Sequence, residues 1–443
     1  MEAIILLLTI VLYFLAPNNY DFFYCCVLLI LFVFSAYRAI KISMVEQNYV
    51  NFTFFFTISF FFVNFFYPVF IFPFDKYYFL VFSRFKFNED VITKATSLAL
   101  VGYTSFVFGI KSIFSQKRAK KIERPYINEK VIINNSFKIY LIFSWAFTGI
   151  VFLIAKDGIL ARSSDAFFNI EPSLLVINQC FINLLIIFTF YLRKSFFNLS
   201  IVFIYIFVFI FVGDRGPAVQ TSLVLLISYS IFYKKISRLK LFLSVLIGFV
   251  GLTIISSIRG REGSTNNISS VQYNNYYDFA MDLIVNNRNL YAGYDYVEKY
   301  GLNYGSSSLP YIFAPIPKLP SLITTTFFDS TPQELSTGTI LTNDVNATWG
   351  LGTNLIIDIY MQFDIIGVIA LMFGLGYIVT KLELNVTNKL FSTICYIFIF
   401  SFSVYMTRSS LFDSVRYISW AAVIYFGIIS LYKPFLISKN QLK

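Results

Sequence analysis

FFYCCVLLILFVFSAYRAI, residues Phe22–Ile40, is apolar along almost its whole length and carries one charged residue, Arg38, close to its end. A helix needs roughly 20 mostly apolar residues to cross the hydrocarbon core of a bilayer, and this run has that length and composition. Similar runs recur from the first residues of the chain to the last. The pattern predicts a chain built from membrane-spanning helices.

About twelve segments of this kind can be marked along the sequence. Hydrophobic residues make up 57% of the chain and charged residues 13%, whereas soluble domains carry about a quarter charged residues. We therefore expect an all-α, polytopic membrane domain that covers residues 1–443. The expected spans are Ala3–Ala16, Phe22–Ile40, Val50–Pro73, Val91–Ile110, Phe137–Ala155, Leu174–Leu192, Leu199–Val212, Ala218–Tyr233, Leu239–Ile258, Asn354–Thr380, Leu390–Met406 and Tyr417–Tyr432.

The cysteine, histidine and charge content excludes several classes of site. Cys25, Cys26, Cys180 and Cys395 all fall inside apolar runs, so neither a disulfide framework nor a metal site is indicated. The chain has no histidine, which removes the commonest general base and the commonest zinc ligand. The chain has 35 Lys and Arg residues against 24 Asp and Glu residues. The basic residues cluster at span ends, which indicates membrane topology and not a nucleic-acid-binding surface. No cofactor, metal or nucleic-acid partner is expected.

Basic residues follow every second span, which fixes the expected orientation. The positive-inside rule places such connections in the cytoplasm, and an even number of spans then puts both termini there. The segment Arg259–Gly352 becomes one large external loop between the ninth and tenth spans. The turn Gly213–Pro217 and the connection Thr407–Arg416 lie on the same outer side. The basic connections are Arg38 and Lys41, Lys111–Lys130, Arg193 and Lys194, Lys234–Lys240, and Lys381 and Lys389.

Several arginines stand on the expected outer side, against the positive-inside bias. Guanidinium groups match phosphate oxygens in two-pronged fashion, so converging arginines would suit a pyrophosphate at the membrane surface. The alternative is that they reach lipid headgroups or pair with Asp214, Glu262 and Asp413 nearby in sequence. The arginines are Arg215, Arg259, Arg261, Arg408 and Arg416.

Short helices are expected in the outer loop at Tyr276–Asn287 and Leu290–Tyr300. The loop and the span after it offer two further candidate groups. Aromatic rings and hydroxyls can stack on and hydrogen-bond sugars, although tyrosines also form interface belts. Asp358 lies inside an apolar span, where an ionisable side chain is costly and indicates a functional site. The alternative is that Asp358 forms a salt bridge with one of the outer arginines. On a regular helix Asp364 would point about 120° away from Asp358. The candidate sugar-binding tyrosines are Tyr273, Tyr276, Tyr277, Tyr294 and Tyr360.

Two motifs resemble those of bacterial O-antigen and capsule repeat-unit polymerases of the Wzy type. The first is GDRGP at Gly213–Pro217, similar to the family's Gly-x-Arg-Gly turn at the outer end of a middle span. The second is GLGTNLIIDIYMQFDIIG at Gly350–Gly367, where the family shows small polar residues, a Glu, a Tyr and a Phe-Gly-x-x-Gly ending. Asp358 stands at the Glu position, and Asp364 replaces the first glycine of that ending. The layout of about twelve spans and one large outer loop is similar too.

The resemblance implies transfer of a growing glycan from undecaprenyl pyrophosphate onto a new lipid-linked repeat unit, at the outer face of the bacterial inner membrane. Its partners would be the lipid-linked donor and acceptor, membrane lipid and a chain-length regulator. Arginines such as Arg215 could stabilise charge on the leaving phosphate without a metal. Asp358, or a loop carboxylate among Asp278, Asp282 and Asp344, would accept the proton of the attacking hydroxyl.

Four other functions remain open at this stage. An O-antigen ligase would share the arginines but usually relies on an external histidine, which this chain lacks. A flippase of lipid-linked oligosaccharide would be expected to show two similar halves and short loops. A glycosyltransferase that uses a polyprenyl-monophosphate sugar places acidic residues in its first outer loop, here only Pro17–Asp21. A structural membrane protein is the fourth.

Overall fold

The computed structural model describes residues 1–44, 50–116, 127–161, 166–167, 170–237, 239–241, 243, 277–347, 350–386 and 389–441. Every regular element within these ranges is helical, as expected. The candidate residues Arg259, Arg261, Tyr273 and Tyr276 lie outside them, as does most of the expected span Leu239–Ile258.

The longer helices follow the apolar segments of the sequence. Short helical turns at Glu89–Val91, Phe196–Leu199, Asp278–Ala280 (η5) and Met406–Arg408 (η6) connect some of them. The helices are α1 (Glu2–Leu15), α2 (Phe22–Ser43), α3 (Phe52–Phe61), the π-helix η2 (Phe62–Ile71), α4 (Phe72–Asp75), α5 (Leu80–Arg84), α6 (Ile92–Gln116), α7 (Ile127–Ile154), α8 (Lys156–Leu160), α9 (Pro172–Leu192), α10 (Ser200–Val212), α11 (Arg215–Phe232), α13 (Met281–Ile284), α14 (Asn287–Tyr300), α15 (Leu309–Phe313), α16 (Leu319–Phe328), α17 (Thr337–Asp344), α18 (Leu355–Leu384), α19 (Leu390–Ser401) and α20 (Asp413–Gln441).

Seven helical segments of the described chain are long and apolar enough to cross a bilayer. Three further expected spans correspond to the shorter apolar helices α1, α10 and α19, and an eleventh corresponds to the less apolar α11. The chain is therefore a helical integral membrane protein. The seven long segments are Phe22–Ser43, Phe52–Asp75, Glu89–Ile113, Glu129–Ile154, Pro172–Leu192, Leu355–Leu384 and Asp413–Leu431.

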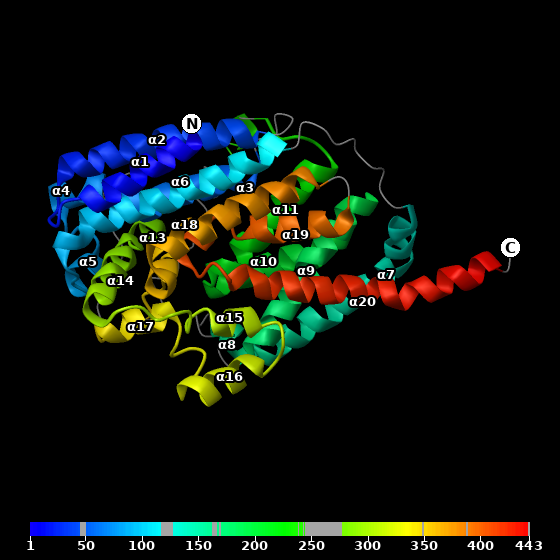
Figure 1. Cartoon of the computed structure of the whole chain (residues 1–443). Coiled ribbons are helices and arrows are strands. Elements are labelled where there is room, and N and C mark those ends of the chain that lie inside the picture. Colours follow the sequence, from blue (N-terminus) through cyan, green and yellow to red (C-terminus); the bar gives the residue numbers. More distant parts are fainter. Residues whose placement is uncertain are drawn as a thin grey trace.

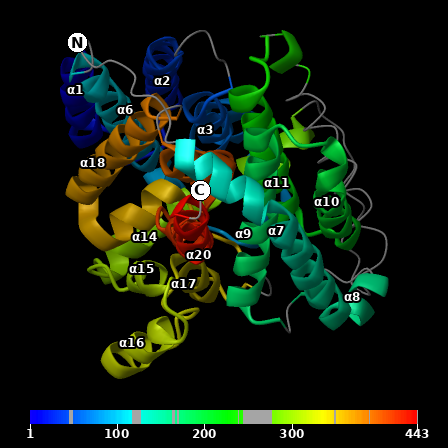
Figure 2. The ribbon, with the colours of Figure 1, turned by 90° about the vertical axis from the view of Figure 1, so that its right-hand side faces the viewer.

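The spans form two groups that α19 and α20 join. In the first group α6 packs against α1, α2 and α18, and in the second α9 packs against α7 and α11. Figure 2 shows the two groups on opposite sides, with α20 between them. α19 contacts both α11 and α18, so the groups share one core.

Glycines bring α6 and α18 into close backbone contact. A Cβ atom on Gly109 would lie 2.1 Å from the Phe373 carbonyl oxygen, and one on Gly376 would lie 2.1 Å from the Phe106 carbonyl oxygen. Small residues permit such an approach, which favours helix association inside a membrane. α18 is thereby held firmly along α6.

The phenylalanine-rich span contains a π-helical segment, η2, which includes Pro68. Proline lacks an N–H, and a wider helix leaves carbonyls that need other donors inside a membrane. Tyr20 donates to the Pro68 carbonyl at 2.8 Å, and the Asn287 side chain donates to the Phe62 carbonyl at 2.8 Å. The irregular segment therefore binds α14 to the bundle.

α18 is interrupted at Asp364, whose φ of 56° and ψ of −168° are not helical. The regular helix assumed for the expected angle between Asp358 and Asp364 is therefore interrupted at Asp364 itself. Asp358 is buried while Asp364 is half-buried, so the two carboxylates still lie in different surroundings.

Residues 277–347 fold into short helices beside the spans. The expected helix Leu290–Tyr300 corresponds to α14, which begins earlier, at Asn287, and ends where Gly301 takes a φ of 83°. In the described part of the expected helix Tyr276–Asn287, from Tyr277 onward, the chain instead forms two short pieces, η5 and α13. Figure 1 shows α14, α15, α16 and α17 along one edge of the bundle.

Candidate functional site

Several helix ends meet beside the short helices of residues 277–347. α10 ends at Gly213, where a φ of 90° closes the helix, and the Asp214 carboxylate caps α11 by accepting from Gly216 N at 3.3 Å. This sharp turn makes Arg215 the first residue of α11. The start of α18 and the connection from α19 to α20 lie at the same end of the bundle, where both line one cavity.

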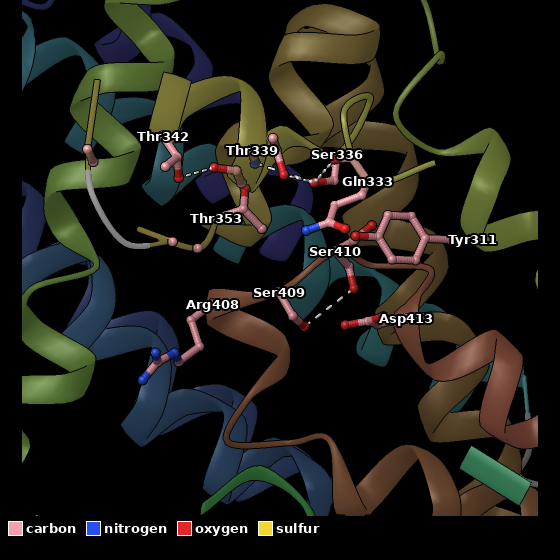
Figure 3. A pocket seen from close by; sticks show the side chains of 14 residues that line it. Tyr311, Gln333, Ser336, Thr339, Thr342, Thr353, Arg408, Ser409, Ser410 and Asp413 are labelled. Atoms are coloured by element: carbon pink, nitrogen blue, oxygen red, sulfur yellow. Dashed lines mark hydrogen bonds between the residues drawn. The ribbon is translucent and has the colours of Figure 1, made fainter. Parts of the chain in front are cut away.

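The cavity has a volume of about 500 Å³ and is lined mostly by hydroxyl-bearing side chains and backbone (Figure 3). Its lining comes from α15 and α17, from the segment before α18 and from the connection between α19 and α20. Arg408 and Asp413 are its charged residues. The lining consists of Tyr311, Gln333, Ser336, Gly338, Thr339, Thr342, Ala347, Gly350, Gly352, Thr353, Arg408, Ser409, Ser410 and Asp413.

The glycine-rich segment before α18 is held in place by α14. Asn289 donates to the Leu351 carbonyl at 2.7 Å, and Asn286 donates to the Thr353 carbonyl at 2.8 Å. Asn354 then caps α18 by accepting from Ile356 N at 2.9 Å and also donates to the Asn64 side chain of η2 at 2.9 Å. These buried amides fix the cavity wall to the spans.

Asp358 lies just behind this wall and does not line the cavity. Its side chain is buried, and Thr337, on α17 between two lining residues, donates to Oδ1 at 2.6 Å. Gln362, one turn further along α18, donates to the same oxygen at 3.3 Å. Ser410 and Asp413 of the cavity lie close to this carboxyl. Within the described part of the chain, Oδ2 accepts no hydrogen bond.

Arg215 and Arg408 converge on Asp282. Arg215 forms an ion pair with the Asp282 carboxylate, and Arg408 Nη1 donates to the Asp282 carbonyl oxygen at 2.9 Å. Desolvation lowers the pKa of Arg408, against an opposing effect of Tyr405. A partly desolvated guanidinium interacts more strongly with an anion than one in bulk water. The structure thus brings together two of the expected arginines.

Arg416 lies on α20 three residues after Asp413, so the two side chains share one face of the helix. Its guanidinium stands 5.6 Å from the centre of the Tyr417 ring. Arg416 does not line the cavity, but its charge acts on Asp413 at the cavity edge.

The expected tyrosines that the structure describes do not gather in the cavity. Tyr277 packs against Phe66 and Tyr78. Tyr294 and Tyr360 are buried and stack on each other with ring centres 5.3 Å apart, and the Tyr13 hydroxyl lies 3.2 Å from that of Tyr294. The cavity is lined by Tyr311 instead.

The sequence interpretation missed two groups. Asp413, Ser409 and Ser410 line the cavity, and their signal was the unusual polarity of Thr407–Arg416 between two apolar spans. Arg288 is fully buried on α14, where Nε donates to the Phe85 carbonyl at 3.2 Å and burial lowers its pKa to about 10. No sequence feature distinguishes Arg288 from an exposed helix residue.

The described residues include no group of three or more His, Cys, Asp or Glu side chains able to hold a metal ion. The cavity instead offers hydroxyl groups, an arginine end and a carboxylate end. Figure 3 shows the Arg408 side chain directed away from Asp413, which lies beside Ser410 and Tyr311. Such a lining can hydrogen-bond a polyhydroxylated ligand and bind an anionic group at one end.

Comparison with known proteins identifies the family of the chain. A similarity search finds no significant match among curated proteins or solved structures. A family model described as O-antigen polysaccharide polymerase Wzy matches residues 1–440. Because this match spans nearly the whole sequence, the chain belongs to the O-antigen polysaccharide polymerase family Wzy.

Proposed function

We propose that this chain polymerises undecaprenyl-pyrophosphate-linked repeat units of O-antigen or capsule in the cavity described above. The growing glycan would be transferred onto a new lipid-linked unit at the outer face of the bacterial inner membrane, with both termini in the cytoplasm. Membership of a polymerase family supports this assignment, as does a polar cavity at the ends of membrane helices. The observation that carries it is the meeting of Arg215 and Arg408 at Asp282.

The reaction joins two lipid-linked sugars without an added energy source. A hydroxyl oxygen of the acceptor sugar attacks the anomeric carbon of the donor, and the bond from that carbon to the pyrophosphate oxygen breaks. The leaving pyrophosphate keeps the electron pair and the polyprenyl chain. The hydroxyl proton passes to a carboxylate. What the protein must supply is stabilisation of the leaving anion and an acceptor for the proton.

The arginines would supply the first of these requirements. Arg215 and Arg408 already contact an anionic residue, and the Asp282 side chain, which is 42% exposed, can leave when a pyrophosphate arrives. In this proposal the Asp282 carboxylate occupies the anion position beside Arg215 until the pyrophosphate replaces it. Arg259, Arg261 and Arg416, also expected from the sequence, would extend the same cationic region.

Two carboxylates are candidates for the second requirement. Asp413 lines the cavity, so it can meet an acceptor hydroxyl directly. Asp358 matches the acidic position of the family resemblance but is only 1% exposed and is shielded by Thr337. We propose Asp413 as the base and Asp358 as a positioning residue that orders Thr337 and the wall around Ser410. Direct proton transfer to Asp358 is the alternative, and would require the wall to open.

Sugar contacts would come from the cavity hydroxyls and from Tyr311. Aromatic faces stack on sugar rings, and Tyr311 lies near the carboxylate end. The buried stack of Tyr294 and Tyr360 would support α14 against α18 in this arrangement. Tyr273, Tyr276 and Tyr277 remain candidate sugar contacts from the loop, and a chain-length regulator remains an expected partner.

Deletion of the gene in a lipopolysaccharide-bearing host tests the proposed function. Unit synthesis and export should continue, so a ligase would attach single units to the lipid core. Gel electrophoresis should show loss of the long-chain ladder with a core-plus-one-unit band retained. Bare core after deletion would contradict the polymerase proposal, because it is the pattern expected for a missing flippase or ligase.

A further inference from the structure

The segment from α15 to α16 carries an apolar surface that the rest of the described chain does not cover. Leu322 is 63% exposed and Phe327 is 75% exposed, and α16 is not one of the seven segments long enough to cross a bilayer. Figures 1 and 2 both show α16 projecting from the edge of the bundle. The α15–α16 apolar surface consists of Ile312, Ile316, Leu322 and Phe327.

α16 is too short to cross a bilayer. Its ten residues extend over about 15 Å, roughly half of the hydrocarbon thickness. It must therefore lie in water or along a surface. Large exposed apolar groups in water are unfavourable, and contiguous ones mark an interaction site.

The two faces of α16 differ in polarity. At about 100° per residue, Leu319, Leu322, Ile323 and Phe327 fall on one side of the helix together with Thr326, and Ser321, Thr325 and Phe328 fall on the other. Lys318 and Asp329 stand exposed at the two ends. Exposed leucine and phenylalanine side chains such as Leu322 and Phe327 are the kind that insert at the boundary between headgroups and acyl chains.

The position of α15 places this surface beside the membrane. α15 packs against both α16 and α20. Tyr311 of α15 and Asp413, the first residue of α20, line the same cavity, so α15 lies at the end of a membrane-spanning helix. α16 therefore stands at the level where that span leaves the bilayer.

We propose that α16 lies in the plane of the membrane interface and inserts Leu322 and Phe327 into the lipid leaflet next to the cavity. The partner is the lipid bilayer itself, bound through acyl chains and not through headgroup charge. This contact fixes α15, and with it the Tyr311 wall, at the lipid surface. The inference depends on the helix geometry and does not require the proposed enzymatic activity.

Site-specific fluorescence in lipid nanodiscs tests the inference. The full chain, with its four native cysteines replaced by alanine, carries either Phe327→Cys or Thr325→Cys, labelled with an environment-sensitive nitrobenzoxadiazole probe. The two positions lie about 160° apart on the helix and are both exposed, so they form a matched pair. Doxyl-labelled phosphatidylcholine is the lipid quencher, and iodide is the aqueous one.

We expect the probe at 327 to be quenched by the doxyl lipid at least about twofold more than the probe at 325, with a blue-shifted emission that high salt leaves unchanged. Equal quenching of both probes by iodide, with no effect of the lipid quencher, would overturn the proposal. Lipid quenching that disappears at high salt would also overturn the proposal, because the contact would then depend on headgroup charge.

A second measurement uses the otherwise native chain. A benzophenone amino acid replaces Phe327, and irradiation in nanodiscs should give a phospholipid adduct detected by mass spectrometry. A benzophenone at position 325 serves as the control. If the benzophenone at position 327 forms an adduct with protein and none with phospholipid, a second polypeptide covers α16, and the lipid assignment is refuted.

Discussion

Arg408 donates from Nη1 to the backbone carbonyl oxygen of Asp282 at a distance of 2.9 Å. The carboxylate of the same aspartate forms an ion pair with Arg215, which stands far from Arg408 in the sequence. Two expected arginines from separate helix ends thus meet at one residue beside the cavity. This arrangement gives the pyrophosphate hypothesis a geometric basis, and it makes the hypothesis testable one residue at a time.

Arg215→Ala and Arg408→Ala should each lower polymer formation by roughly 100-fold to 1,000-fold, the effect of removing one donor to a transition-state anion. Arg215→Lys should restore activity only in part, because lysine keeps the charge but loses the forked geometry. Membrane content of each variant is measured by immunoblot, and polymer by gel electrophoresis.

Asp282→Asn is the control for these variants. It removes the ion pair but leaves the backbone carbonyl that Arg408 contacts. We expect long-chain polymer from this variant. If it is as defective as the alanine variants, the arginines serve to hold Asp282 and do not bind a phosphate.

Asp413→Asn should abolish polymerisation, because the cavity-lining carboxylate can no longer accept a proton. Asp358→Asn keeps a side chain that Thr337 can still contact and should leave partial activity. The two variants are compared for polymer yield at equal protein content. Full activity of Asp413→Asn with loss of activity in Asp358→Asn would make Asp358 the base.

Gly376→Ala should destabilise the protein by about 1–3 kcal/mol, because the added methyl group would meet the Phe106 carbonyl oxygen at 2.1 Å. Gly374 on the same helix is the matched control, since a Cβ atom there meets nothing within 4 Å. Thermal unfolding of the purified proteins in detergent measures the difference. Equal midpoints for the two variants would contradict the close packing of α6 and α18.

Truncated reporter fusions should report the cytoplasm at Arg124 and Lys235, and the outer side at Asn287 and Ser330. This distribution follows from the basic connections between spans. Alkaline phosphatase and green fluorescent protein fusions give opposite signals and check each other. A cytoplasmic signal from Asn287 would reverse the assignment of the cavity to the outer face.

The sequence alone predicted the all-helical membrane fold and the turn that presents Arg215, since both depend on local apolar runs and on a glycine at a helix end. It could not identify Asp413 as a cavity residue, because the cavity exists only once α15 and α17 fold beside the start of α20. Arg288 was missed for a similar reason, since its burial and its contact with the Phe85 carbonyl are tertiary effects.

The break at Asp364 was also missed, because α18 has no proline and its sequence reads as a continuous helix there. A φ of 56° with a ψ of −168° belongs to a region that glycine occupies almost alone, and other residues adopt it at about 1–3 kcal/mol. The family pattern to which the chain is similar has a glycine at this position. Its replacement by Asp364 hid the conformational signal.

Reconstitution with purified protein tests the central claim most directly. Lipid-linked repeat units extracted from the deletion strain would be added to the protein in nanodiscs, with no nucleotide sugar present. We predict a ladder of polymer and release of one undecaprenyl pyrophosphate for each new bond, with neither product from Arg408→Ala. A ladder that forms only after a nucleotide sugar is added, or polymer growth without release of the pyrophosphate carrier, would contradict the account.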